Sequence, residues 1–242
     1  MSESTFVVPG AEIDLNVLDI AQGGDNTATL ETEPEKSIIL GPGLIESENG
    51  VISFVAGHLK HNSNDTVWVE SNRKRATEET EPVIGTVIAR NMDGYRVDID
   101  TVKLANLNGL AFENATKRNK PDLRIGSLVY AKVVLANKYL EPEIECYNNN
   151  TNKSEGFGEL TKGFLIKTSL VHCRRLLQNN SVILNILGQH IAYEIAVGLN
   201  GYVWIKSDSP EKTIIVANAI RNSEHLSDEN CALMVKQMVS TL

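Results

Sequence analysis

The sequence of 242 residues predicts a multi-domain protein of β and α+β class. We expect a small N-terminal β module, a five-stranded β-barrel and a C-terminal α+β domain. Short β-branched segments separated by turn signals run from about residue 36 to 147, and capped helical segments begin only after residue 155. At ~100–200 residues per domain, the length allows one or two ordinary domains or three small ones. The expected boundaries are 1–35 for an acidic, largely flexible segment, then 36–78, 79–150 and 155–242.

Composition restricts the class of protein. Hydrophobic residues make up 42% of the chain and charged residues 22%, which is typical of a folded soluble protein. No apolar run approaches the ~20 residues that cross a bilayer, and the N-terminus lacks the basic and apolar regions of a secretory signal. Cys146, Cys173 and Cys231 are widely spaced and odd in number. We therefore expect a reducing compartment and neither a disulfide framework nor a cysteine zinc site.

The net charge of −8 is distributed unevenly. Residues 1–50 contain ten Asp/Glu and one Lys, a net of −9, whereas residues 51–242 contain 22 Lys/Arg and 21 Asp/Glu, a net of +1. The larger part of the chain can therefore carry local basic clusters. Residues 11–37 hold few large apolar side chains, so we expect disorder or a partner-dependent conformation there. The apolar peptide Phe6–Gly10 is either a docking strand or a frayed terminus.

Three or four short strands are expected in the N-terminal β module. Segments 37–40, 51–55 and 66–70 are rich in β-branched or alternating apolar residues, and Asn49-Gly50 favours a type I′ hairpin. Such a module is small for independent stability and is expected to depend on a neighbour.

Five strands are expected between Pro82 and Tyr147. Asp93-Gly94 marks a hairpin between strands 83–89 and 96–100. One helical turn at 110–115 is expected between the third and fourth strands, and strands 128–136 and 141–146 complete the set. Five strands with a helical turn between the third and fourth are typical of an OB-fold barrel.

The C-terminal region is expected to follow the order β-α-β-β-α-α. Ser169, Ser209 and Ser227 are suitable N-caps for three helices, and Pro210 suits the first helical position. Strands are expected at 182–187, 193–197 and 202–206, which gives an α+β domain.

The segment Gly198-Leu199-Asn200-Gly201 has two readings. A G-x-x-G loop clamps phosphates in KH domains, where it joins two helices. Here it lies between two expected strands, and Asn-Gly is a two-residue hairpin signal. We therefore interpret Gly198, Asn200 and Gly201 as a structural turn and not as an RNA clamp.

The sharpest basic cluster is Lys117, Arg118 and Lys120, with Arg124 close behind. It lies in the expected loop between the third and fourth barrel strands. Loops at the rim of an OB barrel bind single-stranded nucleic acid, and grouped cations attract phosphate. The alternative is a solvated loop that is basic by chance. Tyr95 is the best candidate for base stacking, although aromatic residues are only 5% of the chain. A second cluster, Arg73-Lys74-Arg75, is either a phosphate contact or a solvated linker.

Signatures of catalysis are scarce. The common hydrolase, metalloprotease and P-loop motifs are missing from the sequence. Asp98 and Asp100 share one strand face and could hold Mg²⁺ in a nuclease, but alternating acids on a strand are usually its solvated face. The five histidines form no ligand pattern. We expect no catalytic residue, no metal and no cofactor.

In this order and spacing, the segments resemble the RNA exosome cap subunits that combine an N-terminal domain, an S1-type OB domain and a KH-type domain. The segments that carry the resemblance are Gly41–Leu44, Trp68–Arg75, Val83–Gly85, Phe112–Pro121, Gly126–Glu145, Gly156–Gly158 and Gly198–Lys206. The loop Ala115–Pro121 and the G-x-N-G hairpin are closer to one of the two eukaryotic S1–KH subunits than to its paralogue. The acidic segment at 11–35 resembles the family least.

The resemblance implies a non-catalytic subunit that sits with other cap subunits on a ring of RNase-PH-like subunits. It would stabilise this ring and guide single-stranded RNA into the central channel for 3′-to-5′ degradation and processing by a separate exoribonuclease. Lys117, Arg118 and Lys120 would contact phosphates, the G-x-N-G element would be structural, and the N-terminal module would dock on the ring. The expected location is the nucleus and nucleolus and also the cytoplasm, with no membrane partner. The alternatives are a free-standing RNA-binding adapter, for example in translation, and a metal-dependent nuclease.

Overall fold

The computed structural model describes residues 5–13, 38–47, 50–62, 66–71, 78–137, 139–148, 151–178 and 181–239. The chain divides into two compact units, Met1–Arg73 and Lys74–Leu242, which are described separately. Most of the acidic segment predicted to be flexible, the Asn49 turn position and the basic cluster at 73–75 lie outside the described residues.

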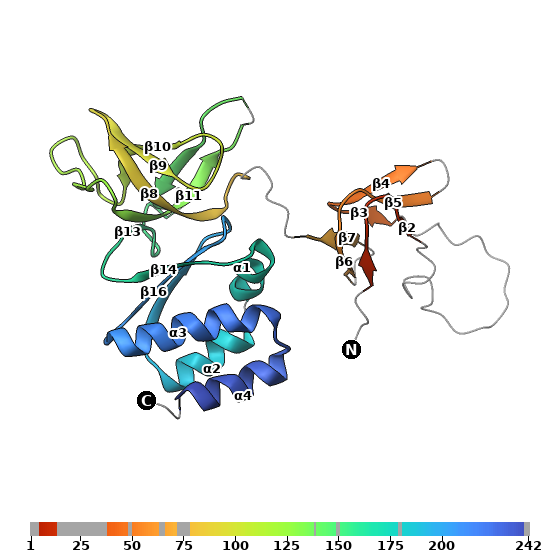
Figure 1. Ribbon diagram of the computed structural model, residues 1–242. Helices are drawn as coiled ribbons and strands as arrows, with labels where there is room; N and C mark the ends of the chain where they lie inside the picture. Colours follow the sequence, from red (N-terminus) through yellow and green to blue (C-terminus); the bar gives the residue numbers. More distant parts are fainter. Residues whose placement is uncertain are drawn as a thin grey trace, which may run out of the picture. The chain divides into compact units, whose positions relative to one another are not determined.

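The first unit consists of two small sheets around one apolar core (Figure 1). The strands are β1 (Phe6–Val7), β2 (Glu12–Ile13), β3 (Ile39–Leu40), β4 (Leu44–Ser47), β5 (Gly50–Ser53), β6 (Gly57–His61) and β7 (Thr66–Glu70). One sheet has the order β1-β6-β7-β3 and the other β2-β5-β4. In β7, Val67 and Val69 are buried while Trp68 lies on the opposite face, as the alternation predicts.

Of the two readings of the Phe6–Gly10 peptide, the structure shows a strand and not a frayed terminus. Phe6 and Val7 pair with His58 and Gly57 of β6, and Glu12 and Ile13 pair with β5. Val7 and Ile13 are buried in the core of the unit, so this apolar peptide is held by the same burial that holds the other strands.

In the second unit, a closed barrel carries the predicted five strands. These are β8 (Pro82–Arg90), β9 (Gly94–Asp98), β10 (Ala105–Phe112), β11 (Leu128–Leu135) and β12 (Glu143–Cys146). The order is β12-β10-β9-β8-β11, and pairing of β11 with β12 closes the barrel. The short strand β13 (Gly158–Leu160) extends the sheet by pairing with the first half of β11. Along β10 every second residue from Ala105 is buried, which fills the barrel.

The helical turn expected at 110–115 is wrong. Residues 110–112 are the end of β10, and a turn follows at 113–114. Ala111 faces the barrel core while Leu110 is exposed, so period-two burial decides this segment.

The C-terminal part of the second unit is a three-stranded sheet covered by helices (Figure 1). Its elements are β14 (Phe164–Lys167), α1 (Leu170–Leu177), α2 (Val182–His190), β15 (Tyr193–Val197), β16 (Tyr202–Ser207), α3 (Pro210–Asn222), η2 (Ser223–His225) and α4 (Asp228–Val239). The sheet order is β14-β16-β15. Alternation along β16 sends Val203 and Ile205 into the core under the helices, and Trp204 into a smaller core shared with the barrel residue Ile84.

The strand expected at 182–187 is wrong, because this segment is the first part of α2. A short apolar run does not distinguish a strand from a buried helix. Here Ile183 and Leu187, four residues apart, are buried on one side of the helix. The observed order is therefore β-α-α-β-β-α-α. Among the described residues, no helix is long and apolar enough to span a membrane.

Candidate nucleic-acid interface and its support

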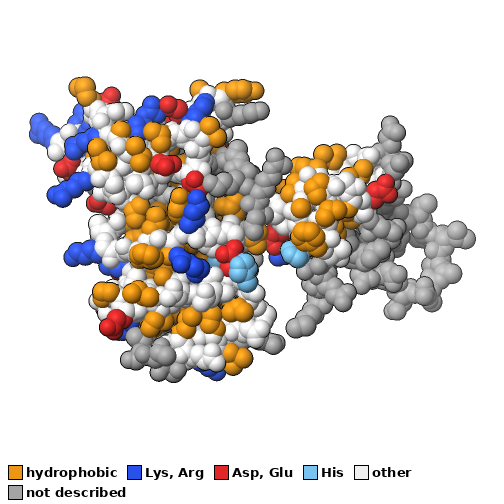
Figure 2. Space-filling view, viewed as in Figure 1, with side chains coloured by type: hydrophobic (Ala, Val, Ile, Leu, Met, Phe, Trp, Pro, Cys, Tyr) orange, Lys and Arg blue, Asp and Glu red, His pale blue; other side chains and the backbone are white. Residues whose placement is uncertain are grey.

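The predicted basic cluster lies in the loop between β10 and β11, residues 113–127. Lys117, Arg118, Lys120 and Arg124 are all exposed. Figure 2 shows Lys and Arg side chains gathered around the barrel part of the second unit. Cations held this close together attract phosphate groups and release counterions when they bind them.

Several contacts attach the second half of this loop to the barrel. The hydroxyl of Tyr95 donates a hydrogen bond to the carbonyl of Pro121, and the backbone N–H of Leu123 donates to the Tyr95 Oη at 3.3 Å. Leu123 itself is buried in the barrel core, and Arg90 forms an ion pair with Asp122. The basic residues are therefore presented by a loop whose C-terminal half has fixed attachment points.

Tyr95 does not have the place that the sequence prediction gave it. Its side chain is 3% exposed and belongs to the barrel core, so no ring face is open to a base. Tyr95 is corrected from a stacking residue to one that positions the basic loop. The predicted position at the start of the second barrel strand was correct. Burial alternates along β9, however, and Tyr95 lies with Val97 on the buried face.

The tip of the loop has its own local structure. Thr116 and Asn119 exchange backbone hydrogen bonds at 3.0 and 3.1 Å, which places Lys117 and Arg118 at the turn between them. At the start of the loop, Glu113 accepts a hydrogen bond from the Ser154 backbone N–H at 2.8 Å. Hydrogen bonding from the Ser154 side chain, and then from its backbone, lowers the pKa of the Glu113 carboxyl group. Both cations at this turn are exposed to solvent.

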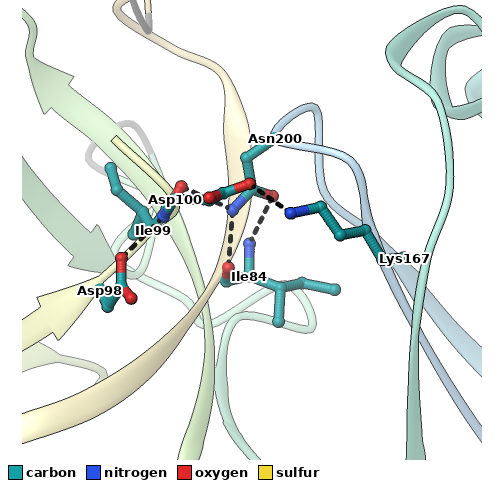
Figure 3. Close-up of polar contacts among 6 residues, drawn as sticks. All are labelled: Ile84, Asp98, Ile99, Asp100, Lys167 and Asn200. Carbon is teal, nitrogen blue, oxygen red and sulfur yellow. Dashed lines mark hydrogen bonds and ion pairs between the residues drawn. The ribbon is translucent and has the colours of Figure 1, made fainter. Parts of the chain in front are cut away.

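The G-x-N-G hairpin lies between β15 and β16 and grips the barrel (Figure 3). The Asn200 Nδ2 donates to the carbonyls of Ile84 at 2.7 Å and Ile99 at 3.0 Å, and its Oδ1 accepts from the Ile84 N–H at 3.2 Å. The Leu199 N–H donates to the Pro82 carbonyl at 2.8 Å. These bonds connect residues about a hundred positions apart in the sequence, with separations of 116 and 101 for the Asn200 contacts.

The hairpin is not the two-residue type I′ turn that Asn-Gly suggested. A type I′ turn needs positive φ at both central residues. In this loop Gly201 has a φ of 89°, but the φ of Asn200 is not positive. Gly201 N–H donates to Gly198 O, and Gly198 N–H donates to Tyr202 O. This is the three-residue loop with a left-handed last residue. A Cβ at Gly198 would lie 2.4 Å from Asn200 Oδ1, so glycine is needed there to let the Asn200 amide turn toward the barrel.

Asp98 and Asp100, the candidates for a metal site, are used in the same junction (Figure 3). Asp98 Oδ1 accepts from the Asp100 N–H at 2.9 Å, and Asp100 Oδ2 pairs with Lys167 Nζ at 3.0 Å. The hydrogen bond with Asp100 is the largest cause of the raised pKa of Lys167. No group of three or more His, Cys, Asp or Glu able to hold a metal occurs in the part of the chain that the structure describes.

The barrel partners of Asn200 are what sequence reasoning missed. Backbone groups of Ile84 and Ile99 carry no signal in a sequence, because any residue type supplies them. The available signal was the G-x-N-G pattern at 198–201, which pointed to a turn but not to what the turn contacts. Taken together, the geometry supports a basic loop for phosphate contacts and a rigid connection between two domains.

Three family models match successive parts of the chain. Residues 38–75 match the model described as the exosome complex exonuclease Rrp40 N-terminal domain, residues 76–158 match the S1 domain of exosome complex component RRP40, and residues 163–211 match a KH domain.

Similar proteins cover most of the chain. Exosome complex component rrp40 of Schizosaccharomyces pombe is 42% identical over 212 residues, covering 85% of this chain and 88% of that protein. The human exosome complex component RRP40 is 33% identical, covering 79% of this chain and 72% of that protein. A solved structure of a protein proposed to be an exosome complex RNA-binding protein has a TM-score of 0.57 at 19% identity, covering 70% of this chain and 99% of that one. This last likeness is one of fold.

Proposed function

The chain belongs to the Rrp40 family of exosome components, and we propose on this premise that it is an RNA-binding and scaffolding cap subunit of the exosome. In this role it would stabilise a ring of RNase-PH-like subunits and guide single-stranded RNA into the central channel for 3′-to-5′ degradation and processing. The observation that carries the proposal, beyond the family, is the exposed and anchored basic loop on the barrel.

The RNA contact is assigned to Lys117, Arg118 and Lys120. Exposed Lys and Arg side chains contact phosphate oxygens, which carry no sequence information, so the contact should be strong at low salt and insensitive to sequence. Tyr95 holds the loop through Pro121 and Leu123 and does not touch RNA.

We assign no catalytic step to the chain. The two carboxylates that could have held a metal are occupied by the Asp100 N–H and by Lys167. RNA cleavage would then belong to another subunit of the complex, and this chain would supply no cofactor chemistry. The location proposed for it is the nucleus and nucleolus, with a further pool in the cytoplasm.

We assign the first unit to docking on the ring. Large apolar side chains are exposed on its short strands and the loops beside them, with exposed fractions between 47% and 60%. They are Phe6, Val8, Ile39, Ile45 and Phe54. Burial of such exposed apolar side chains against another subunit would stabilise an assembly.

The test uses the full chain co-expressed with the remaining exosome subunits. We expect stoichiometric recovery with RNase-PH-like subunits and the other cap subunits. In the assembled complex, reversing Lys117, Arg118 and Lys120 to Glu should weaken RNA binding and leave assembly intact. The slope of log affinity against log salt should fall by roughly 2, since each phosphate contact on a single strand contributes ~0.7.

The matched control reverses three cations on α3 and α4, Lys212, Arg221 and Lys236, which changes the net charge by the same amount. If the control weakens RNA binding as much as the loop variant, the loop is not the contact. If the loop variant fails to assemble, the loop is a protein interface. Recovery of the chain alone would favour the free-standing adapter, and RNA cleavage abolished by Asp98→Asn with Asp100→Asn would favour the nuclease.

A further inference from the structure

The sheet of the C-terminal domain has an unpaired edge at β14. The strand order is β14-β16-β15, so β14 lies at one side of the sheet and pairs with β16. Among the described residues, no other strand pairs with β14. Gly163, Phe164 and Lys167 are exposed along it. An edge of this kind presents backbone N–H and C=O groups with which another strand can pair.

The hydrogen-bond pattern shows which backbone groups of β14 face outward. The Thr168 N–H, directly after the strand, donates to the Gly201 carbonyl at 2.9 Å. In an antiparallel pair every second residue faces the partner strand, so the backbone groups of Leu165 and Lys167 face away from β16. The N–H and C=O groups of these two residues form a short row along the edge.

Apart from its short length, β14 lacks the features that usually protect an exposed edge. Such edges are blocked by proline, by a β-bulge or by a charged side chain that projects over them. The pairing of β14 with β16 is regular, and Lys167 is the one charged residue of the strand. Its Nζ lies 3.0 Å from Asp100 Oδ2 and 5.3 Å from the centre of the Tyr202 ring. The Lys167 side chain is therefore held toward the barrel (Figure 3).

Apolar side chains are exposed next to this edge. Phe164 is 52% exposed, although Ile166 on the same face of the strand is buried. Helix α3 packs against β14, and Ile214 in its first half is 59% exposed. Phe164 pairs with Ile205 near the end of β16, and α3 begins shortly after that strand (Figure 1). The two exposed side chains therefore belong to the same end of the domain.

The edge suits an extended peptide better than RNA. The outward N–H and C=O groups of β14 alternate along one line, which is the complement of another β-strand. An added strand also places alternate side chains on the helix side of the sheet, where an apolar one can contact Phe164 and Ile214. The cations closest along the chain are Lys162 and Lys167, and Lys167 is paired with Asp100. This is a weak site for phosphates, which bind to grouped cations.

We propose that the open edge of β14 is a docking site for an extended segment of another exosome subunit. The segment adds a strand to the sheet through the outward groups of Leu165 and Lys167, and it places an apolar side chain beside Phe164. Assigning the segment to an exosome subunit rests on the proposed function, whereas the peptide-binding edge does not. The edge uses residues other than those assigned above to RNA and to the ring.

The first test asks whether the full chain binds peptides at this edge. A phage-displayed library of random peptides is selected on the immobilised chain, and the enriched peptides are synthesised with a fluorescein label for anisotropy measurements. Lys167→Pro removes an outward N–H and places a ring on the edge, so it should weaken binding about tenfold or more. Lys167→Ala, the matched control, loses the same ion pair but keeps the N–H. It should bind within about twofold of the parent, since an exposed ion pair contributes little.

Phe164→Lys is a second variant that does not depend on proline. It places a charge at an exposed edge position, where lysine blocks strand addition, so it should weaken peptide binding and keep the thermal unfolding midpoint of the parent. Peptides that bind the parent, Lys167→Pro and Phe164→Lys alike would overturn the inference. A selection that enriches no peptide would overturn it as well.

Amide hydrogen exchange, followed by mass spectrometry, identifies the natural occupant. In the full chain alone, the amides of Leu165 and Lys167 should exchange rapidly, and slow exchange there would overturn the proposal because the chain would cover its own edge. In the complex with co-expressed exosome subunits, the same amides should become protected. A complex that forms without this protection overturns the proposal, and so does protection by single-stranded RNA alone or by a second copy at high concentration. If the chain is not recovered with exosome subunits, the proposed function fails, and the selected peptides still decide whether the edge docks a peptide.

Discussion

Asn200→Ala tests whether the G-x-N-G hairpin stabilises the second unit by holding the C-terminal domain against the barrel. In the parent, the Asn200 amide makes three hydrogen bonds to the barrel backbone, two to Ile84 and one to Ile99. Alanine removes all three and leaves one N–H and two carbonyl groups without these partners at a junction that is partly buried.

The expected loss of stability follows from these contacts. A typical hydrogen bond contributes about 0.5–1.5 kcal/mol net, and leaving a buried partner unsatisfied costs about 1–3 kcal/mol. Because the junction admits some water, we place the total at roughly 3–5 kcal/mol for three bonds. For a unit of this size, ~2–4 °C per kcal/mol gives a fall in unfolding midpoint of about 6–20 °C. Asn200→Asp should be no better, because a carboxylate would face the carbonyls of Ile84 and Ile99.

The assay uses the fluorescence of Trp204, which is 5% exposed and belongs to the core between the C-terminal sheet and the barrel. Replacing Trp68, the other tryptophan of the chain, by Phe isolates its signal. Urea unfolding of Asn200→Ala in this background should show the predicted loss, while Asn222→Ala, an exposed asparagine at the end of α3, should change little. A loss below about 0.5 kcal/mol would refute the clamp, because even a single net hydrogen bond contributes that much.

Two other variants test the loop anchor and a buried histidine. Tyr95→Phe keeps the ring in the core but removes the hydroxyl that joins Pro121 and Leu123, so amide exchange in residues 117–124 should speed up and stability should fall by about 1–2 kcal/mol; unchanged exchange by mass spectrometry would contradict the anchor. His172 is 2% exposed with its Nε2 2.9 Å from the Ile220 carbonyl, and burial lowers its pKa. The folded state therefore resists protonation, so its contribution to stability is full above the unfolded pKa of about 6.5 and declines as the pH falls below that value. Urea unfolding between about pH 7.5 and 5 should show this decline, and His172→Gln should flatten it.

The strands of the barrel were predictable because their signals are local. The strands predicted at 96–100 and 128–136 fall on β9 and β11, with the start of the first placed two residues too late, and Asp93-Gly94 marks the hairpin between the first two strands. Gly94 is needed for a second reason that the turn signal does not show. A Cβ there would lie 2.2 Å from the Leu107 carbonyl oxygen, so the close approach of β10 also requires glycine.

The errors arose where tertiary packing decides between local alternatives. Val182–Leu187 suits a strand by composition, but the core beneath α3 and α4 accepts Ile183 and Leu187 as one face of a helix. Tyr95 is a residue type that stacks on bases, but the alternation of side chains along β9 places it inside the barrel. In both cases the sequence gives the residue and its apolar character, and only the packing decides which side it presents.

The inward orientation of the G-x-N-G loop decides where on the second unit RNA can bind. A phosphate clamp needs free backbone N–H groups at the loop. Here the N–H groups of Gly198, Leu199 and Gly201 donate to Tyr202, Pro82 and Gly198, and the Asn200 side chain is bound to the barrel. In this domain the loop therefore holds the barrel and does not offer a phosphate site. We therefore expect contacts with single-stranded RNA at the barrel, where the basic loop is exposed, and the Asn200 contacts hold the C-terminal domain against that barrel.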